Sequence, residues 1–138
     1  MPKQIFSKVK ENLLMLCINR FNEISEDRID ISPANELLQI STKKLKQDTN
    51  FKAHRHNFLE RKTTETHEAW IILEGKIKAT FWDLDDSILF ETALQRGDCA
   101  VVYKAGHSFV VLEENTILYE VKNGPYLGQQ KDKTFIKD

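Results

Sequence analysis

Histidines and an acidic residue gather in one short stretch of this chain. Three of the four histidines, His54, His56 and His67, lie close together, and Glu68 follows at once. The fourth, His107, comes after a glycine at the start of a later apolar segment. Imidazole and carboxylate groups can hold a metal ion or move protons. These residues are therefore the first candidates for a chemical site.

The spacing of the histidines separates two roles. His54 and His56 are two apart in FKAHRHNF, which is predicted to be a strand, so both side chains would leave the same face. That spacing suits chelation of one ion. Burial of both imidazoles without a metal or acidic partner would be costly, which also favours a metal site. Ordinary polar residues at a strand end are the competing interpretation. His67 should point away from Glu68, which favours a supporting or surface role over ligation.

The elements that must position these residues read as β-strands. Short segments rich in β-branched and aromatic residues alternate with turn signals. The predicted strands are LLQIST, FKAHRHNF, HEAWIIL, KIKATFW, SILFETAL, CAVVY, HSFVVL and TILYEVK. About eight strands without intervening helices indicate an all-β sandwich or barrel. The AWIIL segment is apolar on both faces, so it should be central or lie at a subunit contact.

The N-terminal segment is predicted to be different. Apolar residues recur there at the spacing of an amphipathic helix. They are Phe6, Val9, Leu13, Leu16 and Cys17. We therefore expect an N-terminal α-helix and linker over residues 1–30, and a β-barrel domain over residues 31–138.

Composition restricts the possible partners. The chain has 138 residues and a net charge of −1, with no excess of Lys and Arg for nucleic acid. No apolar run approaches the ~20 residues that a membrane span requires. Cys17 and Cys99 form no CxxC motif, and two free thiols suit a reducing compartment. We expect a cytoplasmic protein that binds neither nucleic acid nor membrane.

The histidine stretch resembles the first motif of the cupin superfamily, which runs HxH, Glu, six residues, Gly. The chain has His54-Arg55-His56, then Glu68, AWIILE and Gly75. A second cupin motif runs from a glycine to a histidine, and here DCAVVYKAG separates Gly97 from His107. The usual proline is absent there, and the interval is one residue short.

The ending TILYEVKNGPY is also similar to that of small single-domain cupin metalloproteins associated with bacterial surface-polysaccharide functions. The resemblance spans about residues 37–135. It implies a double-stranded β-helix, or jelly-roll barrel, and one divalent transition metal ion, which could be Fe, Mn, Ni or Zn. The implied ligands are His54, His56, Glu68 and His107. They would leave two positions on a six-coordinate ion for water or substrate.

One departure from the family concerns the carboxylate ligand. The family places three or four residues between the second histidine and the glutamate, whereas eleven separate His56 from Glu68. Glu60 satisfies the short gap, but only Glu68 leads into the strand and glycine. Residues 57–66 would then be an inserted hairpin at the barrel mouth. Glu60 and Arg61 could contact a charged substrate from it, unless the hairpin is merely a solvated loop.

Further candidates lie on the predicted strands. Trp70 shares the face of Glu68 by alternation, so it could line the cavity and stack on a sugar ring. Tyr103 and Tyr119 could donate phenolic protons, and Lys104 could contact the substrate.

The sequence leaves several functions open. The first is a metal-dependent enzyme, of isomerase, epimerase or dioxygenase type, acting on a small polar substrate such as a sugar or nucleotide sugar. The second is a non-catalytic module that binds a small ligand. The third is a metal-free sugar ketoisomerase or epimerase with His54 or His56 as the base. A homodimer is expected in each case.

Overall fold

The computed structural model describes residues 1–137, and this part of the chain is built mainly from ten strands. The expectation of an all-β fold is confirmed at this level. The strands are β1 (Lys3–Phe6), β2 (Leu14–Asn19), β3 (Arg28–Asp30), β4 (Ser41–Lys43), β5 (Glu68–Glu74), β6 (Lys76–Trp82), β7 (Ile88–Gln95), β8 (Cys99–Val102), β9 (Gly106–Val111) and β10 (Ile117–Lys122). A 3-10 turn, η1 (Phe21–Glu23), and one helical turn, α1 (Gln129–Asp132), complete the elements.

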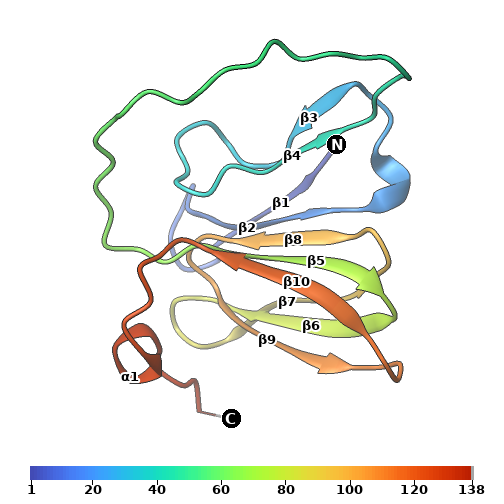
Figure 1. Ribbon diagram of the computed structural model, residues 1–138. Helices are drawn as coiled ribbons and strands as arrows, with labels where there is room; N and C mark the ends of the chain where they lie inside the picture. The colour runs from blue at the N-terminus through green and yellow to red at the C-terminus, as the bar shows by residue number, and fades with distance from the viewer. Residues whose placement is uncertain (138) are drawn as a thin grey trace.

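Two antiparallel sheets face each other and form the body of the molecule (Figure 1). One has five strands in the order β1-β2-β8-β5-β10, and the other has three in the order β7-β6-β9. Neither sheet closes into a barrel within the described residues. A separate two-stranded ribbon joins β3 to β4.

The core lies between the two sheets. Trp70 and Ile72 of β5 pack there against Ile77 and Phe81 of β6, and all four are almost completely buried. A second apolar cluster, which includes Cys17 and Tyr103, lies on the other face of the five-stranded sheet under residues 31–40. β5 is therefore buried on both faces and paired on both edges, as a central strand should be. A single chain does not test the expected homodimer, which stays a prediction.

The predicted N-terminal helix is wrong. Residues 3–19 form the β1–β2 hairpin, and β2 pairs with β8 inside the five-stranded sheet. All six residues of β2 are buried, because the sheet is covered on both faces at this point. A strand buried on both faces has a continuous apolar run. In such a run some apolar residues also fall three or four positions apart, which is the spacing of a helical stripe.

The predicted strand FKAHRHNF is also wrong in this structure. Residues 44–66 contain no strand or helix, and every one of them is exposed. In Figure 1 this segment, coloured teal to green, follows the outside of the molecule between β4 and β5. The predicted LLQIST strand is confirmed only in its last residues, as part of β4. The other six predicted strands correspond to β5 through β10.

No helix within residues 1–137 has both the length and the apolar character that a bilayer crossing requires.

Candidate functional site

A cavity of about 660 Å³ opens where β5, β9 and β10 come together. We call it the Glu68 pocket. Its walls include Glu68, Trp70, Trp82, His107, Phe109 and Glu120. Residues of both sheets and of the C-terminal segment contribute to it, so only the folded chain creates it.

Strand pairing determines which side chains reach this pocket. Glu68 and Trp70 of β5 lie opposite Lys122 and Glu120 of β10 in the antiparallel register. Directly opposite residues of two paired strands project from the same face. His107 comes from β9 in the facing sheet, so the pocket joins the two layers.

The central contact is an ion pair between the two layers. The imidazole Nε2 atom of His107 lies directly against the Glu68 carboxylate, and the side chain of Glu68 is only 8% exposed. The other ring nitrogen, Nδ1, lies 3.1 Å from the carbonyl oxygen of Ala105. Since both nitrogens face oxygen acceptors, the geometry favours the doubly protonated imidazolium.

The pKa values of the pair follow from this geometry. Burial raises the pKa of Glu68, but hydrogen bonds from His107 and Glu120 and the positive charges nearby outweigh it and bring the value to about 2. Burial lowers the pKa of His107, but its hydrogen bond to Glu68 outweighs that effect, and the net pKa is raised. Both shifts favour the charged form of each partner.

Glu120 is the carboxyl group of this site whose pKa is raised. Its hydrogen bond with Glu68 raises its pKa, and burial and the negative charge of Glu68 act in the same direction. Two neighbouring carboxyl groups whose pKa values are driven apart are typical of acid–base sites. Glu68 stays ionised, while Glu120 holds its proton to higher pH.

The indole of Trp70 forms part of the apolar wall. Its ring lies edge-on to His107 and to Phe109, with centroid distances of 5.4 and 5.0 Å. The indole N–H has no hydrogen-bond partner within residues 1–137. Trp70 thus lines the Glu68 pocket, and its contact with a substrate stays a prediction.

The four residues that the cupin resemblance names as metal ligands are not brought together. Glu68 and His107 contact each other, whereas His54 and His56 lie on the exposed segment with their ring centroids 5.5 Å apart. No three His, Cys, Asp or Glu side chains of the described chain are arranged to hold a metal ion. As they lie, these residues do not fit an ion.

The remaining predicted site residues lie away from the Glu68 pocket, with one exception. Glu60 is exposed and pairs with Lys62 at 3.4 Å, and Arg61 is also exposed. Tyr119 is 63% exposed on the opposite face of β10 from Glu120. The exception is Lys104, which lines the pocket and holds both carboxylate oxygens of Glu65 at 2.6 Å.

Tyr103 is buried in the second apolar cluster, where its hydroxyl donates to Ser32 Oγ at 2.9 Å. Burial raises the pKa of this phenol. Because it lies on the far face of the five-stranded sheet, it does not reach the Glu68 pocket.

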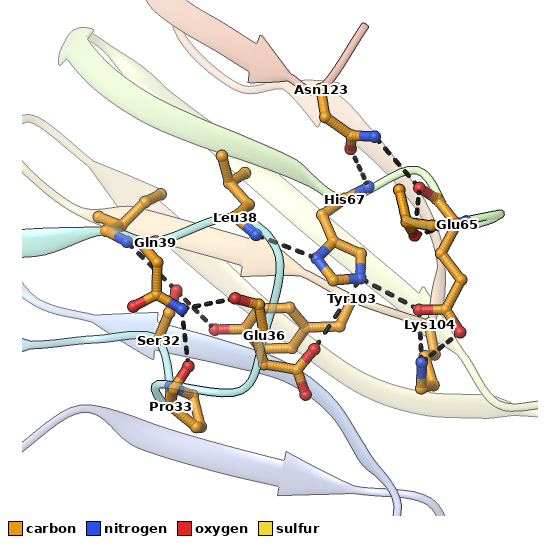
Figure 2. A network of polar contacts seen from close by, with 12 residues as sticks. Ser32, Pro33, Glu36, Leu38, Gln39, Glu65, His67, Tyr103, Lys104 and Asn123 are labelled. Atoms are coloured by element: carbon orange, nitrogen blue, oxygen red, sulfur yellow. Dashed lines mark hydrogen bonds and ion pairs between the residues drawn. The ribbon is translucent and has the colours of Figure 1, made fainter. Parts of the chain in front are cut away.

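His67 organises a network on that same far face (Figure 2). It is 2% exposed, so a surface role is wrong. Its Nδ1 atom accepts the backbone N–H of Leu38 at 3.3 Å, which places the ring proton on Nε2. Nε2 then faces Glu65 at 3.2 Å and Glu36 at 3.9 Å. This network connects residues 36–38 to the start of β5 and so has a structural role.

The sequence does not single out Glu120 or the C-terminal residues of the pocket, and it offers Lys122 as a basic residue without placing it. Alternation along ILYEVK does place Glu120 and Lys122 on one face. The missing signal was the pairing of β10 with β5, which identifies that face as the one beside Glu68.

Comparisons of this chain with family models, with curated proteins and with solved structures find no match.

Proposed function

We propose that this chain is an enzyme of isomerase or epimerase type, which moves a proton on a small polar substrate held in the Glu68 pocket. The observation that carries the proposal is the direct contact between Glu68 and His107 in the wall of a cavity, with Glu120 hydrogen-bonded to the same carboxylate. Titratable groups with displaced pKa values in a cavity are candidates for acid–base chemistry.

Each group has a distinct role in this scheme. His107 has both ring nitrogens engaged, so it holds the Glu68 charge in place and does not itself take a proton from substrate. Glu120 lines the pocket and acts as the acid and base. Its carboxylate removes a proton from a carbon next to a carbonyl, and the electron pair moves to the carbonyl oxygen. The protonated Glu120 then returns the proton to the other face of the same carbon, or to the former carbonyl carbon while the proton of the neighbouring hydroxyl passes to the former carbonyl oxygen.

The class of substrate is part of the same proposal. The pocket has room for a small molecule, and Trp70, Trp82 and Phe109 offer aromatic surfaces to a ring. The sequence resemblance to cupins associated with surface polysaccharide supports a sugar or nucleotide sugar. The two facing sheets support a cupin-type double-stranded β-helix that is open on one side.

Deuterium exchange tests the proposed chemistry. Protein in D₂O, incubated with aldoses, ketoses and nucleotide sugars, is expected to introduce one deuterium into its substrate, measured by mass spectrometry. The Glu120→Gln variant keeps the shape of the side chain but cannot act as a base, so the exchange rate should fall by about a hundredfold or more. The control is Glu114→Gln, in the exposed turn before β10, which should retain the rate. Equal rates in wild type and Glu120→Gln, or no exchange with any substrate, would refute the proposal.

A second candidate function is metal binding. It is favoured by the contact between Glu68 and His107, which are two of the four ligands that the cupin resemblance implies. His54 and His56 could join them only if residues 44–66 followed a different course over the pocket. Elemental analysis of untagged protein should then find about one equivalent of Fe, Mn, Ni or Zn per chain. The His54→Ala/His107→Ala variant should lose it. Protein that contains no metal and takes none up on reconstitution would exclude this candidate.

A further inference from the structure

One end of the Glu68 pocket contains a cation that its neighbours only partly satisfy. Lys122, the last residue of β10, lies opposite Glu68 and lines the pocket. Its side chain is 25% exposed. The ammonium Nζ lies 3.8 Å from the Asp132 carboxylate and 4.6 Å from the centroid of the Tyr126 ring. It makes no hydrogen bond to any side chain of residues 1–137, although an ammonium has three donors.

Some cations of the pocket are held by a carboxylate and others are not. Lys104 is held by both carboxylate oxygens of Glu65, and His107 is held by Glu68. Lys122 and Lys133 remain, with Asp132 as the nearest acid. Although Glu120 lines the same pocket, neither of these two lysines donates a hydrogen bond to a side chain of residues 1–137, so both ammonium groups are open to an acceptor on a ligand.

The C-terminal segment creates this end of the pocket. Residues 132–136 all line the cavity, and they include Lys133 and Phe135. Ile136 anchors the segment by packing closely on Gly106. A Cβ atom added at Gly106 would collide with the Ile136 side chain and would lie 3.2 Å from Trp82. The segment is thus positioned to place the Lys133 ammonium near whatever occupies the cavity.

We propose that the substrate of the Glu68 pocket is a small organic anion, whose carboxylate or phosphate group binds Lys122 and Lys133 while its ring packs on Trp70 and Phe109. This inference rests on the proposed function of the same site and specifies its substrate class. A neutral ligand that displaces water from Lys122 would leave its ammonium short of acceptors, which is unfavourable. An anionic group supplies those acceptors through charge-assisted hydrogen bonds.

Intrinsic fluorescence provides a direct assay for this proposal. The chain has two tryptophans, Trp70 and Trp82, and both line the pocket. Titration with cyclohexanecarboxylate, cyclohexyl phosphate and the neutral cyclohexanecarboxamide compares an anion with a matched neutral probe. Wild type should bind at least one of the two anions about tenfold more tightly than the amide.

Two variants attribute that preference to the lysines. Lys122→Met should weaken binding of the anion about tenfold and leave the affinity for the amide unchanged. Lys133→Met, which alters an exposed side chain and spares the core, should weaken it in the same direction. The control Lys78→Met removes a lysine that pairs with Glu91 outside the pocket, and should bind as wild type does.

Equal affinity of wild type for anion and amide would overturn the inference. Undiminished anion binding by both Lys122→Met and Lys133→Met, or no binding of any probe, would also overturn it. The proposed proton transfer fails in a different way. If the anions bind selectively but no substrate exchanges deuterium, the anion site stands and the enzymatic function falls. If only neutral substrates exchange deuterium, the enzymatic function stands and the anion site falls.

Discussion

Replacement of Glu68 by glutamine is expected to lower the free energy of unfolding by about 1–3 kcal/mol near pH 6. The variant leaves the charged His107 imidazole, which is two-thirds buried, without its counter-ion. A buried charge that loses its partner is strongly unfavourable, whereas exposed ion pairs contribute little. Urea unfolding of the wild type and the variant measures the difference.

The pH dependence of this difference follows from the pKa values of the pair. Glu68 has its pKa lowered from 4.5 to about 2, so its contribution to stability is complete above pH 4.5 and is lost as the pH falls toward 2. His107 has its pKa raised above 6.5, so its contribution is present below pH 6.5 and is lost as the pH rises through the folded-state value. Between pH 4.5 and 6.5 both contributions are present. The variant should therefore differ most from wild type in this window, and a difference that is constant with pH would contradict the ion pair.

Replacement of Asp98 by alanine is expected to have the largest effect on stability, a loss of about 3–5 kcal/mol. The Asp98 side chain is 5% exposed. It accepts the backbone N–H groups of Phe21 and Gln95, each at 3.0 Å, and the Arg20 guanidinium at 3.1 Å. It thus fastens the end of β2 to the turn between β7 and β8. Alanine leaves all three donors without this acceptor, and thermal or urea unfolding would report the loss.

A matched control is Asp30→Ala. Asp30 also pairs with an arginine, Arg28, at 2.9 Å, but both side chains are about 60% exposed. Exposed pairs of this kind contribute about 0–1 kcal/mol. Asp98→Ala with as small an effect as the control would show that the Asp98 hydrogen bonds do not hold the two elements together.

The sequence predicts strands well where one face is buried. KIKATFW alternates apolar and polar residues, and β6 follows that alternation in its burial. Alternation disappears at β2, where both faces of the strand are covered, and the strand is therefore not predicted there. At residues 44–66 the opposite occurs, because His54 and His56 alternate as in a strand but no neighbouring strand pairs with them. A strand requires a partner, and local sequence does not show the partner.

The sequence predicts only part of the candidate site, again because it does not show which strands pair. The sequence singles out both Glu68 and His107, and the structure brings them into contact. It does not single out Glu120, because the importance of this residue comes from the pairing of β10 with β5 across a long sequence separation. The spacing of His54 suggests a ligand, but the segment that carries it lies outside the sheets.

The protonation state of His107 is the first property to measure, because a charged pair with Glu68 in the pocket requires a doubly protonated imidazole. Nitrogen-15 NMR of labelled histidine rings, followed over pH, gives the state of both ring nitrogens. We expect His107 to remain doubly protonated above pH 6.5 in the wild type and to lose its proton at a lower pH in Glu68→Gln. A wild-type His107 that is already neutral at pH 6.5, or that titrates identically in the variant, would contradict it.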